Sequence, residues 1–227
     1  MLIAGFPTGA FQANCYVLAT EPGGPCLAVD PGQDAAEPLA ALLAEHRLTP
    51  SAVLLTHGHL DHVAGAAQVC GRAGIPAHIA AADEHLLDDP LAGLSAELRS
   101  ALVGFPLDGL RPPEVVLLAD RLESAGIRLH VDRTPGHTPG SVVFRIEADE
   151  AARHPEVLFT GDILFAGSVG RTDLPGGSWE ELQHSLRASL LTRTDDAVVL
   201  PGHGPSSTIG AERVGNPFLT DGAGLGE

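Results

Sequence analysis

Short apolar runs bounded by glycine, proline and polar residues recur through the first third of the chain, and such runs are typical of strands. They predict strands at residues 2–6, 15–19, 26–30, 52–56 and 77–80. Gly23, Gly24 and Pro25 separate the second run from the third and predict a hairpin turn. The fourth run leads directly into a cluster of histidines, so the end of that strand is a candidate position for a site.

Two stretches between these strands have apolar residues at helical spacing. In residues 34–47 three leucines share one face, and Asp34 is the predicted N-cap. Residues 60–72 predict a second helix, because a glycine and a proline follow shortly after it.

The second half of the chain alternates between strand-like and helix-like segments. Residues 81–113 predict a less regular helical segment, with an amphipathic stretch at 94–103. Later apolar runs predict strands at 115–118, 128–133, 142–146, 157–160 and 197–200, with a helix at 179–191. Strands with interspersed helices favour sheets covered by helices. The hairpin-like pairs argue against a purely parallel doubly wound sheet, so we expect an α/β fold of another kind.

Composition narrows the class of protein. The chain has 227 residues, 44% hydrophobic and 19% charged, which predicts one globular domain over 1–227. With 13 basic and 29 acidic residues its net charge is −16, and every basic residue is an arginine. A surface this acidic argues against nucleic acid or an anionic membrane as a partner. No uncharged apolar stretch reaches about 18 residues, so we expect no membrane span.

The cysteines and the N-terminus predict a cytoplasmic protein. Cys15, Cys26 and Cys70 are odd in number and lack metal-type spacing, which indicates reduced thiols rather than a disulfide framework. The N-terminus has no basic region followed by a long apolar run, so we expect no secretory signal.

The strand at 52–56 is followed by four potential metal ligands within six residues. These are His57, His59, Asp61 and His62. A single tetrahedral ion does not use all four from so tight a cluster, whereas two adjacent ions can share them. The cluster therefore predicts a metal site with room for two ions.

Three further candidates lie downstream, each at a predicted strand end beside glycine or proline. They are His137, Asp162 and His203. Neutral imidazoles combined with carboxylates suit zinc, iron or manganese and not calcium. The other six histidines lack such a context, although His85 belongs to the helical segment that could overhang a site.

In this order and spacing, the seven candidates resemble the hallmark motif of the metallo-β-lactamase-fold hydrolases. The resemblance implies a four-layer αβ/βα sandwich with two divalent metal ions at the sheet edges, zinc in the first instance and iron or manganese otherwise. It implies a first metal on His57, His59 and His137, a second on Asp61, His62 and His203, and Asp162 bridging both.

Other residues acquire roles from the same resemblance. Asp30 would contact the metal ligands without binding a metal itself. Arg171 and Asp173 would brace the metal loop or form a structural ion pair. Trp179 is expected in the core rather than in contact with substrate. The segment 81–113 would roof the active site.

Within the superfamily the chain looks most like the glyoxalase II group, the hydroxyacylglutathione hydrolases and their relatives. The supporting motifs are Asn14-Cys15-Tyr16, Val29-Asp30-Pro31-Gly32, the run from Thr134 to Ser141, the run from Gly161 to Phe165, the run from Gly170 to Asp173 and the run from Pro201 to Gly204. The resemblance implies hydrolysis of a small-molecule thioester by a metal-bridging hydroxide, with Asp61 and Asp162 as catalytic residues. Glyoxalase II enzymes carry a glutathione-binding helical domain after this region, and only a short stretch follows His203 here, so we expect weak glutathione specificity.

Two other functions stay open. A persulfide dioxygenase of the related group would use a single iron on two histidines and one aspartate, but Pro201-Gly202-His203-Gly204 looks like the dinuclear hydrolases. A non-catalytic metal-binding or partner-binding module is the other alternative. The acyl group, the thiol, the native metal and the oligomeric state are left open.

Overall fold

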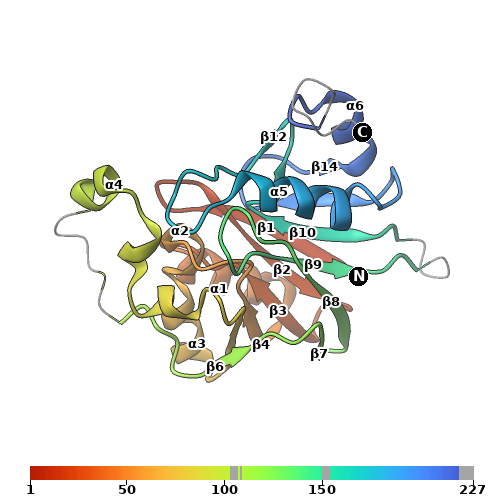
Figure 1. Ribbon diagram of the computed structural model, residues 1–227. Helices are drawn as coiled ribbons and strands as arrows, with labels where there is room; N and C mark the ends of the chain where they lie inside the picture. Colours follow the sequence, from red (N-terminus) through yellow and green to blue (C-terminus); the bar gives the residue numbers. More distant parts are fainter. Residues whose placement is uncertain (103–106, 108, 150–153, 220–227) are drawn as a thin grey trace.

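The computed structural model describes residues 1–102, 107, 109–149 and 154–219, and two six-stranded sheets lie at its centre (Figure 1). The first sheet has the order β1-β2-β3-β4-β5-β6. Its first three strands are antiparallel, and β3 to β6 run parallel. The strands are β1 (Leu2–Thr8), β2 (Ala13–Ala19), β3 (Pro25–Val29), β4 (Thr49–Leu54), β5 (Ala77–Ile79) and β6 (Val115–Leu117).

The second sheet has the order β14-β13-β10-β9-β8-β7. All of its pairs are antiparallel except β10 with β13. The strands are β7 (Arg121–Ser124), β8 (Ile127–Arg133), β9 (Val142–Ile146), β10 (Val157–Gly161), β13 (Val198–Pro201) and β14 (Ser207–Thr208). A separate two-stranded ribbon contains β11 (Leu164–Phe165) and β12 (Ser168–Val169).

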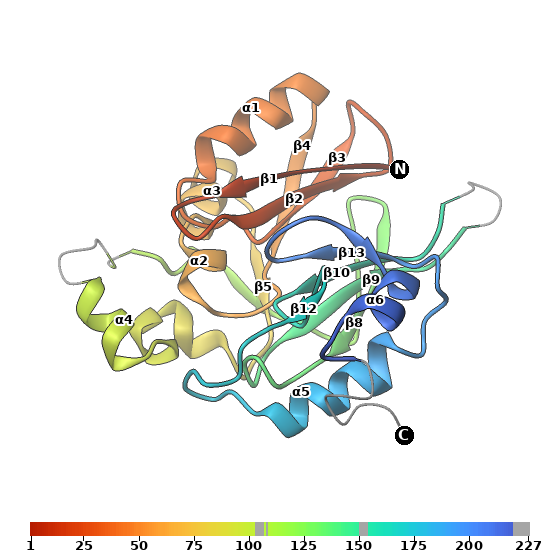
Figure 2. The same cartoon turned by 90° about the horizontal axis from the view of Figure 1, so that it is seen from above.

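Helices cover the outer face of each sheet (Figure 2). On the first sheet lie α1 (Ala36–His46) and α3 (Ala66–Ala73). On the second lie α5 (Trp179–Ser185), the π-helical turn η3 (Leu186–Leu190) and α6 (Ile209–Gly215). Shorter helices occupy the connections: α2 (Leu60–Val63), the 3-10 helices η1 (Glu84–Leu87) and η2 (Pro90–Gly93), and α4 (Ala96–Ala101).

The fold has four layers, in the order helices, sheet, sheet and helices, and an apolar cluster lies between each layer and the next. Successive side chains of a strand point to opposite faces of its sheet, so Val17 joins the outer cluster under α1 and α3 while Leu18 joins the cluster between the sheets. Phe144 and Phe159 reach the central cluster from the second sheet. A third cluster lies under α5 and α6. This arrangement confirms the expected α/β class and the four-layer αβ/βα sandwich.

The hairpin predicted at Gly23 to Pro25 is confirmed, because β2 and β3 pair antiparallel on either side of it. The predicted N-cap at Asp34 is wrong, since α1 begins at Ala36 after Ala35. Asp34 has a φ of 61° and still belongs to the turn after β3. An aspartate tolerates this left-handed backbone, and the helical bonding starts one residue later, with Leu39 N–H donating to Ala35 O.

The single helix predicted at residues 60–72 is also wrong, because the chain forms α2 and α3 instead. The break comes where Gly65 N–H donates to the carbonyl oxygen of Pro31 at 2.9 Å. A Cβ on Gly65 would overlap the carbonyl oxygen of Gly32, so only glycine allows this close approach. The contact holds the loop after β3 against the end of α2, the short helix that contains Asp61 and His62.

Three further expectations need correction. Trp179 is not in the core: its side chain is 38% exposed and its ring meets Phe218 edge-on. Strand β7 was not predicted, because it is short and alternates polar with half-buried residues. The segment 81–113 contains three short helices, and its amphipathic stretch narrows to α4; residues 103–106 and 108 lie outside the described residues.

All three cysteines are buried and none of them forms a disulfide, in agreement with the prediction from their number and spacing. Burial raises the pKa of the Cys26 thiol to about 11 and that of Cys70 to about 12, so these thiols are protonated and inert at neutral pH. Among the described helices, none combines the length and the apolar character that crossing a membrane requires.

Candidate metal centre

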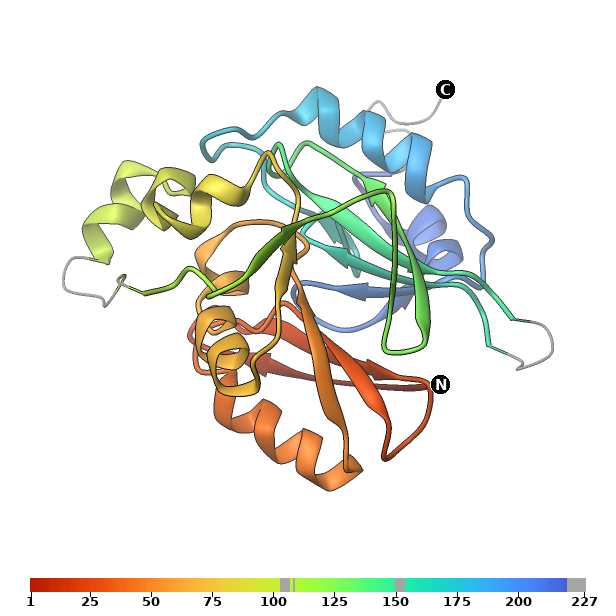
Figure 3. The same cartoon turned by 90° about the horizontal axis from the view of Figure 1, so that it is seen from below.

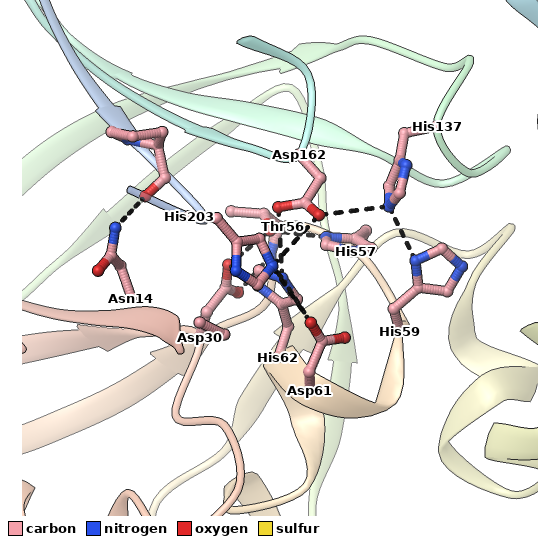
Figure 4. A network of polar contacts seen from close by, with 12 residues as sticks. Asn14, Asp30, Thr56, His57, His59, Asp61, His62, His137, Asp162 and His203 are labelled. Carbon is pink, nitrogen blue, oxygen red and sulfur yellow. Dashed lines mark hydrogen bonds and ion pairs between the residues drawn. The ribbon is translucent and has the colours of Figure 1, made fainter. Parts of the chain in front are cut away.

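The seven candidate ligands come from four connections that meet at one end of the two sheets (Figure 4). The loop after β4 and the start of α2 carry four of them, and the β8–β9 connection, the end of β10 and the end of β13 carry one each. Because these strand ends lie side by side, residues up to 146 positions apart in the chain face one another: His57, His59, Asp61, His62, His137, Asp162 and His203.

The first group is His57, His59 and His137. Their potential ligand atoms all lie within 4.8 Å of one another, and all three side chains are buried. Nδ1 of His59 is 2.8 Å from Nε2 of His137. The group therefore has the residue types and the spacing of a three-nitrogen metal site.

The second group is Asp61, His62 and His203, whose potential ligand atoms also lie within 4.8 Å of one another. Nε2 of His203 is 3.2 Å from Oδ2 of Asp61 and 3.3 Å from Nε2 of His62. Asp61 and His203 are partly exposed, so this side of the centre is open to solvent.

Asp162 lies between the two groups. Its Oδ2 is 3.6 Å from Nε2 of His137 and 3.5 Å from Nε2 of His203. Its Oδ1 is 3.3 Å from Nε2 of His62. The carboxylate thus faces one histidine of the first group and two of the second, which is the placement a bridging ligand requires.

A buried carboxylate and hydroxyl set the ring orientation on one side of the centre. Oδ2 of Asp30 accepts the Thr56 hydroxyl proton at 2.6 Å and lies 3.0 Å from Nδ1 of His62. Because the single hydroxyl proton of Thr56 goes to Asp30, the hydroxyl oxygen accepts from Nδ1 of His57 at 3.0 Å. Both imidazoles are therefore left with Nε2 for the centre, as outer partners of metal-binding histidines commonly arrange.

These contacts place Asp30 against Thr56 and His62, and its role outside a metal site stays a prediction. Asp30, His57 and His62 also form a buried group of ligand atoms within 4.8 Å. The carboxylate of Asp30 is already engaged, however, since it also accepts the Thr56 backbone N–H at 2.8 Å. Its backbone is left-handed, with a φ of 48°, a conformation held where surrounding contacts over-determine it.

Backbone carbonyls orient the other two downstream histidines. Nδ1 of His137 donates to Arg171 O at 2.7 Å, and Nδ1 of His203 donates to Phe11 O at 3.1 Å. The Arg171 guanidinium forms two 2.7 Å bonds with the Asp173 carboxylate. Arg171 and Asp173 therefore form the expected ion pair, and the loop reaches the centre through a backbone oxygen.

Several buried atoms of the centre have no hydrogen-bond partner. In the described part of the chain these include His57 Nε2 and Asp162 Oδ1. A buried polar atom without a partner costs free energy, and coordination to a metal would satisfy it. Nδ1 of His57 is taken up by Thr56, so Nε2 is the atom left for an ion. The residues present thus fit a bound metal.

Two imidazoles of the first group already have the protonation state that a metal ligand needs. Burial lowers the pKa of His57 well below its usual value and that of His59 to about 3, so both imidazoles are neutral at pH 7. Burial opposes ionisation of Asp162, but the nearby His62 outweighs it and lowers the pKa of the carboxyl group. Burial opposes protonation of His62, but the carboxylates of Asp162 and Asp61 in turn raise the pKa of His62 well above its usual value, so a divalent ion that binds there takes the place of a proton.

Close packing at the strand ends explains one glycine of the motifs. A Cβ on Gly202 would overlap Oδ1 of Asp162, and it would come within 2.7 Å of the His62 ring. Glycine therefore allows the end of β13 to approach the centre, which brings His203 beside Asp162.

Asp83 is a buried residue of this region that the sequence did not single out. Its carboxylate accepts Gly58 N–H at 2.8 Å, Gly140 N–H at 2.7 Å and the Thr138 hydroxyl at 2.7 Å. It thereby ties the loop of His57 to that of His137. The surrounding sequence is rich in acidic residues and offers no local signal that distinguishes this one.

The start of β2 holds the last loop of the centre. Asn14 Nδ2 donates to the carbonyl oxygens of Pro201 and Gly204, and the Tyr16 hydroxyl donates to Pro201 O. Asn14 and Tyr16 belong to a motif that the resemblance had identified, but the sequence did not predict these contacts.

A cavity of about 360 Å³ opens above the centre. Its floor contains five of the seven candidates: His59, Asp61, His137, Asp162 and His203. Leu94, Leu98 and Leu102 of the segment 81–113 line one wall. His85 is exposed and is not among the described residues that line the cavity.

Comparison with known proteins agrees with this geometry. The model of the metallo-beta-lactamase superfamily matches residues 8–203. An uncharacterized protein of Mycobacterium tuberculosis is 47% identical over 222 residues, which are 96% of this chain and 98% of that protein. The hydroxyacylglutathione hydrolase GloC of Haemophilus influenzae is 37% identical over 221 residues, 96% of this chain and 98% of that protein.

Two solved structures are similar over almost the whole chain. The BLEG-1 B3 metallo-beta-lactamase superposes with a TM-score of 0.83 at 37% identity, covering 96% of this chain and 100% of that one. TTHA1623, solved in a di-iron-bound form, superposes with a TM-score of 0.77 at 35% identity, covering 95% of this chain and 100% of that one.

Proposed function

This chain belongs to the metallo-beta-lactamase superfamily and is a metal-dependent hydrolase, and we propose that it is a two-metal thioesterase acting on thioesters of small thiols. The observation that carries the proposal is the pair of three-ligand groups with Asp162 between them. The similarity to a hydroxyacylglutathione hydrolase supports the substrate class.

The ligand roles follow the grouping of the side chains. His57, His59 and His137 would hold the first ion, Asp61, His62 and His203 the second, and Asp162 both. Nitrogen and carboxylate donors of this kind suit zinc, with iron or manganese as alternatives. The di-iron form of TTHA1623 supports two ions, and it makes iron the first alternative.

Two divalent ions would lower the pKa of a water molecule toward neutrality and polarise the carbonyl group of a substrate. Hydrogen bonds from the chain's own residues fix the orientation of four histidine rings at the centre. Asp30 and Thr56 hold the rings of His62 and His57, while carbonyl oxygens hold those of His137 and His203. Asp61 and Asp162 bring two carboxylates to the cavity floor, where they can accept a proton from the attacking water.

The leaving group is the reason to propose a thioester. Hydrolysis breaks the carbonyl–sulfur bond, adds water at the carbonyl carbon, and releases a carboxylic acid and a thiol. A thiol has a pKa of about 8.5, so it can leave as thiolate without an acid. Among the described cavity residues, the side chains that carry polar hydrogens are those of Arg171 and of the histidines proposed as ligands. An unactivated amide, whose amine must be protonated as it leaves, therefore fits less well.

A substrate panel tests the proposal. Protein loaded with zinc, or separately with iron, should hydrolyse simple acyl thioesters of a neutral thiol at least about 100-fold faster than its metal-free form, because the attacking water depends on the ions. Release of thiol would be followed with a disulfide dye.

The same preparations would be tested with a β-lactam, and with a persulfide while oxygen uptake is recorded. A β-lactam hydrolysed with a larger kcat/KM than every thioester would assign the centre to the activity named for BLEG-1 instead. Oxygen uptake with persulfide, without thioester hydrolysis, would assign it to a dioxygenase. No turnover in any arm would leave a non-catalytic module.

A further inference from the structure

The cavity above the metal centre is lined mainly by apolar side chains, which come from several segments of the chain. Leu94, Leu98 and Leu102 form one side, and Phe11, Phe165 and Leu174 also line the cavity. Leu98 lies in α4 and Leu102 is its C-cap residue, so these two share one face of the helix, whereas Leu94 precedes the helix with an extended backbone.

This leucine face is not explained by core packing. Of the described residues, the three apolar core clusters include none of these three leucines. Figure 3 shows α4 at the periphery, apart from the four layers. Glu97, Arg99 and Ser100 on the same helix are exposed, and Arg99 and Ser100 bond to nearby backbone carbonyls. The helix therefore directs its polar side to solvent and its leucines to the space above the metal centre.

The cavity offers little to a substrate carboxylate. Arg171 is the one cationic side chain among the described lining residues, histidines apart, and both of its bonds of 2.7 Å go to Asp173. Asp61 and Asp162 add negative charge at the floor. A thiol with free carboxylates, such as glutathione, would find no unpaired arginine among these lining residues.

We propose that this cavity binds an aliphatic acyl chain, held between the leucine face of α4 and Leu174, so that the substrates are thioesters of apolar acids. Small thiols are polar, so the apolar part of such a thioester is its acyl chain. The acyl chain rather than the thiol is therefore assigned to the apolar cavity. A cavity of about 360 Å³ lies at the lower end of the usual range for small-molecule sites, which suits a short to medium chain. The reaction part of this inference rests on the proposed thioesterase function, whereas the binding part does not.

The test is a chain-length series on the metal-loaded protein. Acetyl, butyryl, hexanoyl and octanoyl thioesters of one neutral thiol should show kcat/KM rising about two- to fourfold per methylene until the cavity is full, since each buried methylene contributes about 0.8 kcal/mol. Thioether analogues with the same chains, which cannot be hydrolysed, should bind with Kd falling by a similar factor in calorimetry.

Variants locate the chain. Leu98→Ala and, from another side of the cavity, Leu174→Ala should each reduce the octanoyl-to-acetyl ratio of kcat/KM, and the matching ratio of analogue affinities, by about tenfold. Leu117→Ala is the matched control, because Leu117 is 50% exposed on β6 and is not among the residues lining the cavity; its ratios should equal those of wild type.

The outcomes separate the two proposals. Analogue affinity that does not change with chain length, or a chain-length dependence that survives both cavity variants, overturns the acyl-chain inference even if thioesters are cleaved. Affinity that rises with chain length, with no thioester of any length hydrolysed, upholds the cavity inference and defeats the proposed thioesterase.

Discussion

His203→Ala should lower thioester hydrolysis by at least about 100-fold, about 3 kcal/mol of transition-state stabilisation, and remove one metal equivalent per chain. His203 stands 3.2 Å from Asp61 and 3.3 Å from His62, so its loss leaves the second group with two ligands. The first group shares none of these residues and should keep its ion. Metal content by elemental analysis and hydrolysis would be measured on the same preparations.

His184→Ala is the matched control, because His184 is exposed on α5, outside the residues that line the cavity. It should keep wild-type metal content and rate. The dioxygenase alternative predicts a different result: with one iron on two histidines and one aspartate, oxygen uptake with persulfide would partly survive in His203→Ala. Wild-type oxygen uptake at one iron per chain, little changed in this variant, would defeat the hydrolase assignment.

Asp83→Ala should destabilise the protein by about 3–5 kcal/mol and lower its Tm by about 10 °C. The substitution leaves Gly58 N–H, Gly140 N–H and the Thr138 hydroxyl without their buried acceptor. Hydrogen bonds to a charged group contribute about 1.5–3 kcal/mol each, and such losses are not fully additive. Thermal unfolding of metal-loaded and metal-free protein would measure the effect.

The metal-free comparison matters because Asp83 also joins two ligand loops. Its loss should weaken metal binding about 10- to 100-fold, as the loss of outer partners of metal ligands commonly does. Asp120→Ala is the control, since that carboxylate is 89% exposed, and its Tm should stay within about 2 °C of wild type. A Tm of Asp83→Ala equal to that of the control would show that the carboxylate does not hold the two loops together.

Most strands and the positions of the seven candidates could be predicted because they depend on patterns that are local in sequence, whereas the four-layer sandwich and the grouping of the candidates were implied by the family resemblance. Apolar runs marked the strands, and each downstream candidate lay just past one of them beside glycine or proline. Helix ends were harder, because Asp34 has the residue type of an N-cap but the chain is still turning there. The break at Gly65 depends on a contact with Pro31, which no helical pattern contains.

The outer support of the centre could not be predicted for a related reason. Asp83, Thr56 and the carbonyl oxygen of Phe11 act through hydrogen bonds to segments distant in the chain. Their residue types are common, so only the folded geometry distinguishes them from ordinary polar positions. Trp179 was expected in the core, yet it lies at the surface against Phe218.

The most direct test of the two-metal thioesterase is a titration of metal-free protein with zinc, during which thioester hydrolysis and bound metal are measured at each step. The ligand groups predict that bound metal saturates close to two ions per chain and that hydrolysis reaches its maximum only with the second. Saturation at one ion, unchanged by iron or manganese, or two bound ions without thioester hydrolysis above that of the metal-free protein, would contradict it.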